Sequence, residues 1–231
     1  MSVSAAKANR ESAGFTMIEV LVTLVILMIG LLGIAGLMAQ GQRASFEAYQ
    51  RQQALALAND MAERVKANRP GVDNTAVATT YAAAVPVGTP AGTSTRFTAL
   101  TADDIVNCAT SNCTTSDMVE YDAAIWDGLL AGAAAETERS TGAAIGPLLN
   151  PRGCIQTPSE TACVCGGAPA SRQVTYRISV AWQGSYSTFE PAAADTCGSG
   201  LYNDPRTGTV DDAFRRLVSV DVYTVIPCAC P

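Results

Sequence analysis

The sequence predicts an α+β protein in which a long N-terminal helix, apolar in its first half, packs by its second half on an antiparallel sheet. Three observations predict this class. No charged residue occurs in the 19 positions from Val20 to Met38. Two later segments alternate apolar and polar residues, as half-buried strands do. Eight cysteines in the same later region indicate that disulfides stabilise the domain.

The N-terminal segment differs from a secretory signal peptide. The 14 residues before Phe15, MSVSAAKANRESAG, contain no apolar core, so the apolar segment that follows is expected to stay with the mature protein. As a helix, Val20 to Met38 would reach about 28 Å, enough to cross a bilayer. Lys7 and Arg10 precede this segment, and the positive-inside tendency therefore keeps the N-terminus cytoplasmic and exports the rest.

The residues Gly14-Phe15-Thr16-Met17-Ile18-Glu19, followed by a long apolar run, resemble the class III signal of type IV pilins and pseudopilins. The resemblance reaches to about residue 60. It implies that a prepilin peptidase cuts between Gly14 and Phe15 and methylates the new N-terminal Phe15. It also implies a leader peptide over 1–14, a transmembrane and filament-core helix segment over 15–39, and a globular pilin domain over 40–231.

Glu19 is the one acidic residue at the start of the apolar run. A carboxylate costs a few kcal/mol at the centre of a bilayer and less near its edge, so it usually has a partner. Cleavage before Phe15 would create an α-amine one helical turn away, and the helix dipole favours a carboxylate in the first turn. The resemblance implies that Thr16 and Glu19 act in assembly, with Glu19 meeting the terminal amine of a neighbouring subunit. The alternative is a membrane anchor whose Glu19 lies among lipid headgroups.

Beyond Met38 the helix is expected to continue, with an apolar stripe facing a core. Asn68-Arg69-Pro70-Gly71 would end it, which gives a helix from Phe15 to Asn68, about 80 Å long. The stripe consists of Phe46, Tyr49, Leu57, Met61 and Val65. The apolar half contains three glycines, Gly30, Gly33 and Gly36. We expect them to permit close helix packing or local melting in a filament. The alternative is that they simply weaken the helix.

The middle of the chain predicts less regular structure. Residues 71–100 lack clear periodicity and are expected to form an irregular, partly extended connection. A short amphipathic helix is expected next, with Asp117 as N-cap, Glu120 three residues later, and an end near Gly128 to Gly132. We expect Trp126 on this helix to belong to the core.

The two alternating segments are Gln173 to Gln183 and Arg216 to Ile226. They predict antiparallel strands with one buried face, on which the long helix can pack. The intervening residues, Gly184 to Asp212, contain many turn-forming residues and are expected to form a long ordered loop held by Cys197.

All eight cysteines lie in the part expected to be exported, where disulfides are the default. Their pairing stays open because eight cysteines permit 105 arrangements, although the short loop between Cys108 and Cys113 favours that pair. A zinc site formed by Cys163, Cys165, Cys228 and Cys230 is a less favoured alternative. The disulfide candidates are Cys108, Cys113, Cys154, Cys163, Cys165, Cys197, Cys228 and Cys230.

Composition gives little support for catalysis or for nucleic-acid binding. The chain has no histidine, which removes Ser-His and Cys-His nucleophiles. The adjacent acids Asp103-Asp104 and Asp211-Asp212 are interpreted as turn or cap residues. Loss of residues 1–14 would leave 13 basic and 20 acidic residues, a net charge of −7, so nucleic-acid binding is not expected. Arg215-Arg216 is the only adjacent basic pair.

Several segments beyond the signal resemble PilV-type minor pilins. They are Ile18-Glu19-Val20-Leu21-Val22, Arg51-Gln52-Gln53-Ala54-Leu55-Ala56, Asn59-Asp60-Met61-Ala62-Glu63-Arg64, Asp122-x-x-x-Trp126 and Tyr176-x-Ile178-x-Val180-x-Trp182. The resemblance implies a pilin-like fold and a non-enzymatic structural subunit without cofactor, metal or small-molecule substrate. It further implies a minor pilin that primes type IV pilus assembly with other minor and major pilins and sits at the tip, supporting adhesion and twitching motility.

Such a subunit would be held in the inner membrane with a periplasmic domain and then be assembled into the cell-surface pilus. The alternatives are a minor pseudopilin of a type II secretion system and a ligand-binding or DNA-binding uptake pilin. Both would share the signal, the helix and the sheet, so the sequence leaves them open.

Overall fold

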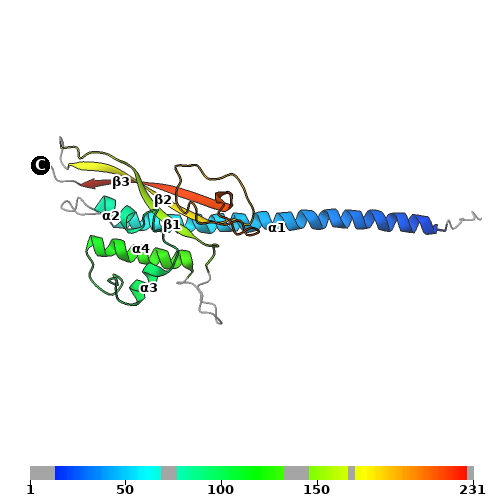
Figure 1. Ribbon diagram of the computed structural model, residues 1–231, viewed down its shortest axis with the longest axis horizontal. Helices are drawn as coiled ribbons and strands as arrows, with labels where there is room; N and C mark the ends of the chain where they lie inside the picture. The colour runs from blue at the N-terminus through cyan, green and yellow to red at the C-terminus, as the bar shows by residue number, and fades with distance from the viewer. Residues whose placement is uncertain (1–13, 69–76, 133–145, 166–169, 228–231) are drawn as a thin grey trace, which may run out of the picture. The chain divides into compact units, whose positions relative to one another are not determined.

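The computed structural model describes residues 14–68, 77–132, 146–165 and 170–227 (Figure 1). The chain forms two compact units, Met1–Phe46 and Glu47–Pro231. The first unit contains the apolar part of helix α1. The second contains the rest of α1, three further α-helices and a three-stranded sheet.

Helix α1 spans Met17–Ala67, within two residues of the predicted bounds at either end. In the second unit it buries one face, formed largely by small residues: Gln50, Ala54, Ala58, Met61, Ala62 and Val65. The predicted stripe was wrong at its start, because Phe46 and Tyr49 are about half exposed. Successive residues point about 100° apart on a helix, so Phe46 lies about 80° from Ala54, at the border of the buried face, and Tyr49 lies about 140° from it, on the far side.

Two short helices correct the predicted irregular connection. Helix α2 spans Val77–Ala84 and helix α3 spans Thr95–Thr101. The N-cap of α3, Ser94, has a φ of 61° and no side-chain cap bond. The first-turn N–H groups of Arg96 and Phe97 instead donate to Asp127, about 30 positions later. Because the cap comes from another helix, no local sequence signal marks α3.

Helix α4 spans Thr115–Ala131. Its N-cap is Thr114 and not Asp117 as predicted. Thr114 Oγ1 accepts the N–H of Asp117, and the Asp117 carboxylate accepts the N–H of Thr114, which completes a capping box. Asp117 is therefore the acidic partner in the first turn, where hydrogen bonds from Thr114 lower its pKa. The helix ends at Gly132 with a φ of 80°, a left-handed C-cap that favours glycine.

The sheet has the order β1-β2-β3 and is antiparallel throughout. Strands β2, Ser171–Gln183, and β3, Arg215–Pro227, confirm the two predicted strands. Strand β1, Arg152–Glu160, was missed because Pro158 and a register shift between Gln156 and Ser159 interrupt its alternation.

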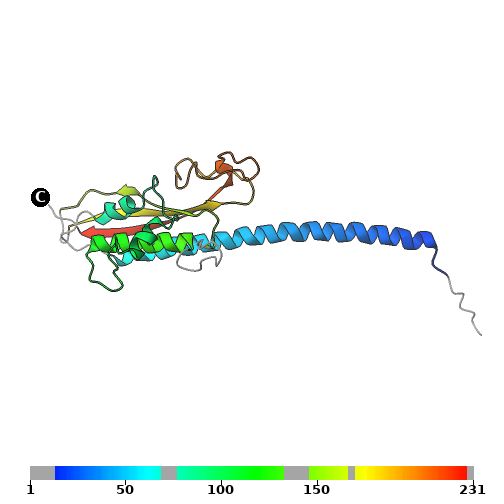
Figure 2. The same ribbon diagram turned by 60° about the horizontal axis from the view of Figure 1, so that its bottom comes forward.

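One face of the sheet packs with the second half of α1 and with α4 in a single core (Figure 2). The largest strand contributions to this core come from Tyr176, Ile178 and Trp182 of β2 and Ile226 of β3. Trp126 of α4 is fully buried, and its indole N–H donates to the carbonyl of Leu57 on α1 at 2.9 Å. This bond ties α4 to α1, and it confirms that Trp126 belongs to the core.

The long loop between β2 and β3 lies over the other face of the sheet. A disulfide joins Cys197 of this loop to Cys154 of β1. Cys154 pairs with Ser179 in the β1–β2 ladder, and Ser179 is 1% exposed. The loop thus covers one part of the outer sheet face, near the start of β1.

Candidate assembly and processing site

The start of α1 contains the residues for which processing and assembly roles were predicted. Gly14, Phe15 and Thr16 precede the helix and are not helical themselves. The carbonyl of Thr16 accepts the N–H groups of Glu19 and Val20 at 3.1 and 3.4 Å. Thr16 is thus the residue at which helical hydrogen bonding begins, and the peptide bond between Gly14 and Phe15 lies just outside it. Both residues are exposed and lie outside the helix, so a peptidase can reach the bond between them.

Glu19 lies in the first turn of α1. Its carboxylate has no ion-pair partner within the part of the chain that the structure describes. The free N–H groups of the first turn carry the positive end of the helix dipole, so a carboxylate there is favourable. Phe15 is four positions earlier, and its main-chain nitrogen would carry the charge after cleavage. Glu19 therefore presents an unpaired negative charge beside the predicted new terminus.

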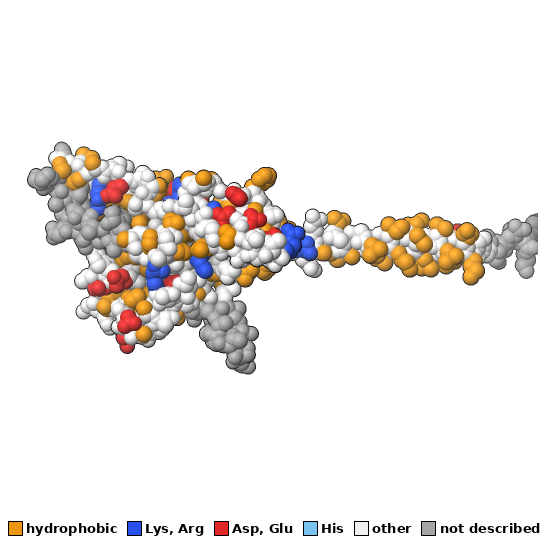
Figure 3. Space-filling model, in the orientation of Figure 1, with side chains coloured by type: hydrophobic (Ala, Val, Ile, Leu, Met, Phe, Trp, Pro, Cys, Tyr) orange, Lys and Arg blue, Asp and Glu red, His pale blue; other side chains and the backbone are white. Residues whose placement is uncertain are grey.

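The rest of this unit is an apolar helix with no internal core. None of its most apolar 18-residue window is buried, and the window is long enough to span a membrane. Figure 3 shows hydrophobic side chains along this part of α1. Side chains such as Met17, Leu32 and Leu37 are each more than 70% exposed. A surface of this kind is stable only against lipid or against other apolar surfaces.

Within the part of the chain that the structure describes, Thr23 and the three glycines of this segment make no tertiary contact. Thr23 donates its hydroxyl to the carbonyl of Val20 within the helix. A Cβ atom added to Gly30, Gly33 or Gly36 would meet nothing within 4 Å. The fold of the described chain therefore does not require these glycines, which leaves close approach to another helix as a reason for them.

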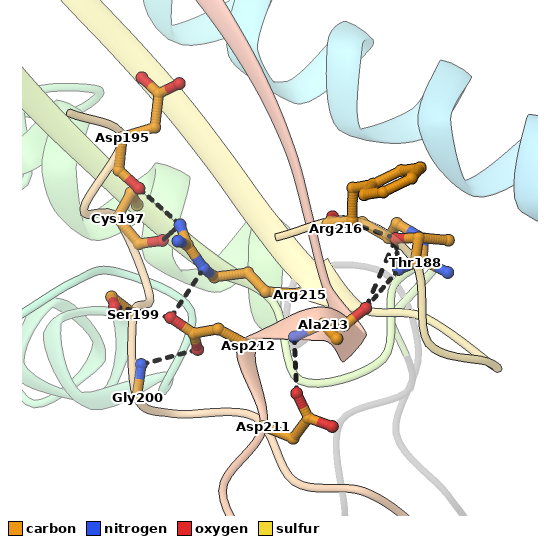
Figure 4. Close-up of polar contacts among 11 residues, drawn as sticks. Thr188, Asp195, Cys197, Ser199, Gly200, Asp211, Asp212, Ala213, Arg215 and Arg216 are labelled. Atoms are coloured by element: carbon orange, nitrogen blue, oxygen red, sulfur yellow. Dashed lines mark hydrogen bonds and ion pairs between the residues drawn. The ribbon is translucent and has the colours of Figure 1, made fainter. Parts of the chain in front are cut away.

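The adjacent pair Arg215 and Arg216 does not form a free basic patch (Figure 4). Arg215 is 4% exposed and donates to the carbonyls of Asp195 and Cys197 at 2.6 and 3.1 Å. Its Nε also lies 3.4 Å from an oxygen of Asp212. These bonds hold the β2–β3 loop onto the start of β3. The Arg215 charge is used inside the protein and is not available to a phosphate.

Arg216 connects the same loop to α1. It donates to Thr188 Oγ1 at 2.7 Å and to the carbonyl of Tyr186 at 2.7 Å, and it pairs with Glu47 at 3.3 Å. Its guanidinium lies 5.2 Å from the centre of the Tyr186 ring. A hydrogen bond to Glu47 raises the pKa of the Tyr186 hydroxyl. A Cβ on Gly184 would lie 2.5 Å from the guanidinium carbon, so a larger residue there would require the Arg216 guanidinium to shift. Arg216 is recognisable in the sequence as half of a basic pair, but no local pattern indicates this role.

Six of the eight candidate cysteines lie in the described chain, and all six are disulfide-bonded. Cys108 bonds to Cys113, the pair that the short loop favours. Cys163 and Cys165 lie 3.8 Å apart at their sulfurs, and each is disulfide-bonded. An oxidised cysteine has no thiolate with which to bind zinc. The remaining two, Cys228 and Cys230, lie outside the described residues.

The two acidic pairs have local roles. Asp103 has a φ of 63° and lies with Asp104 in the turn after α3. Asp211 caps the short 3₁₀ helix Asp212–Phe214 by accepting the N–H of Ala213 at 2.9 Å (Figure 4). Asp212 accepts from Ser199 and from the N–H of Gly200. These carboxylates serve turns and loops, as their positions in the sequence indicate.

Comparisons with known proteins match two parts of the chain. Residues 9–35 match the family model of the prokaryotic N-terminal methylation motif. Residues 37–124 match the family model described as type IV pilin Tt1218. Over these two ranges the chain is similar to type IV pilins. A search of curated proteins and a search of solved structures each gave no match.

These two matches support a coarse description of the chain. They support a pilin-type structural subunit, and the methylation motif with its apolar helix is consistent with membrane anchoring and assembly into a pilus. The match to the methylation motif includes Gly14, Phe15 and Glu19. The matched range of the second model ends within α4, so the sheet lies beyond it.

Proposed function

We propose that this chain is a minor pilin that primes type IV pilus assembly and sits at the pilus tip, where it supports adhesion and twitching motility. The observation that carries the proposal is the start of α1. Glu19, a carboxylate with no ion-pair partner among the residues described, lies in the first turn of an exposed apolar helix, four positions after Phe15. Before assembly the helix would be held in the inner membrane with the globular domain in the periplasm.

The same observation supports the three parts of the chain. Residues 1–14 would be the leader, residues 15–39 the filament-core segment, and residues 40–231 the globular pilin domain. The helix buries no side chain before Gln50, so its earlier residues are free to pack against lipid first and against other subunits later.

Glu19 would set the axial register between the helices of neighbouring subunits in the filament. A carboxylate in an apolar medium is stable only with a partner, and the methylated α-amine of Phe15 in a neighbouring subunit provides one. Pairing with a neighbour fixes how far one helix slides along the next, since a shifted helix would leave both charges unpaired. Thr16 would support this by holding Glu19 in the first helical turn.

The minor-pilin class is supported by where the PilV-like positions lie. Asp122 and Trp126 of the matching helix both contact α1, through Arg64 and the carbonyl of Leu57. Tyr176, Ile178 and Trp182 of the matching strand lie in the core. The resemblance therefore falls on residues that join the long helix to the domain, and not on exposed loops.

The direct test is incorporation into filaments. Glu19→Ala is expected to abolish recovery of the chain in sheared pili while leaving its level in the membrane unchanged. Glu63→Ala, which removes an exposed carboxylate from the same helix, is the matched control and should be incorporated normally. Equal incorporation of the Glu19 variant and the control would exclude the assembly role.

Processing is tested by mass spectrometry of the membrane-held chain. The expected mass lacks residues 1–14 and carries one additional methyl group on Phe15. Gly14→Val should leave the leader in place. A full-length mass for the unaltered chain, or a truncation beyond Phe15, would contradict the proposal.

A minor pseudopilin of a type II secretion system remains the second candidate, because the first family model is specific to the methylation motif and not to one machinery. A deletion strain separates the two. Loss of twitching motility with normal exoprotein secretion supports the pilus, and the converse supports the secretion system. A DNA-uptake role has less support, since Arg215 and Arg216 are both engaged within the protein.

A further inference from the structure

The outer face of the sheet is covered at one end and open at the other. The Cys154–Cys197 disulfide holds the β2–β3 loop over the sheet at Ser179. Four positions earlier on β2, Thr175 pairs with Tyr223 of β3, and Tyr223 is 78% exposed. Val225, the next outward residue of β3, is 61% exposed. An exposed aromatic ring on the middle of a regular strand is therefore part of an uncovered surface.

This open face is hollowed into a pocket of about 360 Å³, within the usual range for small-molecule sites. Its outer-face residues follow the strand register, because Ser159 of β1 pairs with Thr175 of β2, which pairs with Tyr223 of β3. All three strands thus contribute. The described lining residues are Ser159, Thr161, Gln173, Val174, Thr175, Tyr223, Thr224 and Val225.

None of the lining residues that the structure describes is charged. The next outward row of the sheet has Arg177 and Asp221, which bind each other through two hydrogen bonds of 2.8 and 2.9 Å and so neutralise each other. Beside the pocket, Arg172 and Glu160 are also paired with each other. A phosphate or another anion needs unpaired cations, and a Ca²⁺ ion needs carboxylates. The lining provides neither.

What the pocket does provide is hydroxyl and amide groups next to an aromatic ring. Ser159 and Thr175 hydrogen-bond to each other at 3.0 Å, and Thr161 accepts the N–H of Gln173 at 2.8 Å. These bonds fix the floor. The side-chain amide of Gln173 and the hydroxyl of Tyr223 have no hydrogen-bond partner among the residues described. Both groups donate and accept hydrogen bonds.

A neutral sugar has the matching chemistry. One face of a pyranose ring is a flat array of C–H groups that packs on an aromatic ring, and its rim consists of hydroxyls that donate and accept. Strand pairing fixes the backbone of Tyr223, so binding has to order only the side chain. We propose that this face of the sheet binds a neutral carbohydrate, with Tyr223 as the stacking platform and Gln173 as a hydrogen-bonding partner. The inference rests on the proposed adhesive role, for which it names the ligand class.

The test uses the full chain in a detergent without a sugar headgroup. Its binding is measured to an array of immobilised neutral oligosaccharides built from glucose, galactose, mannose and N-acetylglucosamine, and then to the best of these in solution. Tyr223→Ala is expected to weaken binding about tenfold, since an aromatic contact contributes up to about 1.5 kcal/mol. Tyr223→Phe should retain most of the affinity, because the ring remains.

Phe189→Ala is the matched control. Phe189 is 98% exposed and lies on the β2–β3 loop, outside the pocket, so this variant should bind like the unaltered chain. Binding should also be the same at low and high salt, because no charge takes part. No binding to any neutral oligosaccharide, equal losses in the Tyr223 and Phe189 variants, or a preference for anionic polysaccharides with steep salt dependence would overturn the proposal.

These measurements are independent of filament assembly. A chain that binds sugar but is not incorporated into pili would contradict the proposed function and leave the carbohydrate site standing. A chain that is incorporated normally but binds no sugar would remove only the site.

Discussion

The hydroxyl of Tyr81 donates to Oδ2 of Asp122 at 2.8 Å inside the globular unit. The other oxygen of this carboxylate accepts from Arg64 at 3.1 Å. Tyr81 belongs to α2, Asp122 to α4 and Arg64 to α1, so one carboxylate joins three helices. The Asp122 side chain is 7% exposed, and a carboxylate buried to this extent is tolerated only because both oxygens have partners.

Removing one partner should therefore cost more than removing a surface hydrogen bond. Asp122→Ala is expected to lower the free energy of unfolding by about 3 kcal/mol, because Arg64 and Tyr81 both lose an acceptor. Tyr81→Phe should cost about 1 kcal/mol. The measurement is chemical unfolding followed by tryptophan fluorescence, for which Trp126 and Trp182 are both buried reporters. Equal costs for the two variants would show that the carboxylate is not the shared element.

The pH dependence of stability should differ between Asp122 and Asp221. Burial raises the pKa of Asp122, against the opposing hydrogen bonds from Tyr81 and Arg64. Its protonation therefore favours the folded state, and this contribution is lost as pH rises through the raised pKa. Hydrogen bonds from Arg177 lower the pKa of Asp221. That contribution is present at neutral pH and is lost as pH falls from the ordinary aspartate value toward the lowered one.

The two asparagine variants measure these opposite signs. As pH falls into the acid range, the unaltered chain should gain stability relative to Asp122→Asn and lose stability relative to Asp221→Asn. The second difference should stay below about 1 kcal/mol, since Arg177 and Asp221 are both about one-third exposed. Differences of the same sign in both variants would contradict the assignment.

Asp127 holds α3 and the turn before it. Its carboxylate accepts four backbone N–H groups, from Gly92, Thr93, Arg96 and Phe97, at 2.6 to 3.3 Å. Because Asp127 is fully buried, Asp127→Ala should leave these donors unsatisfied and cost at least about 3 kcal/mol. Hydrogen exchange should locate the loss in residues 92–101.

The control for this variant is on the same helix. Glu120→Ala removes an exposed carboxylate from α4 that has no ion pair among the described residues and should change stability by less than about 0.5 kcal/mol. If α3 stayed protected in the Asp127 variant, its cap would have to come from elsewhere.

The elements that the sequence predicted are those with strong local periodicity. The uncharged run of α1 and the alternation of β2 and β3 need no partner to be recognised. Helix α3 was not predicted because its cap is Asp127, a residue of another helix. Strand β1 was not predicted because its alternating pattern breaks at Pro158. The predicted stripe of α1 was wrong only at its start, because Gln50, Ala54 and Ala58 are buried there while Phe46 and Tyr49 are about half exposed.

The processing motif and the outer-face pocket also differ in how far the sequence predicts them. The processing motif is contiguous from Gly14 to Glu19 and is visible in the sequence. The outer-face pocket depends on the register of three strands, one of which was not predicted. Tyr223 and Gln173 lie 50 positions apart in the sequence and meet only through the pairing of β2 with β3, so no local pattern could have placed them together.

A substitution at Gly153 would test how closely β1 approaches α4. A Cβ atom at this position would lie 2.5 Å from Cη2 of Trp126 and 2.6 Å from Cδ1 of Leu130. The backbone cannot move away easily, because Gly153 exchanges two hydrogen bonds of 2.8 and 2.9 Å with Ala91. Gly153→Ala should therefore cost about 1 to 3 kcal/mol of unfolding free energy by overpacking, and it should shift the fluorescence of Trp126.

Gly88→Ala is the control. A Cβ at Gly88 meets nothing within 4 Å, so this variant should change stability by less than about 0.5 kcal/mol. Equal stability of the two variants would mean that Trp126 can give way, and that β1 and α4 are less tightly packed than the contacts around Gly153 indicate.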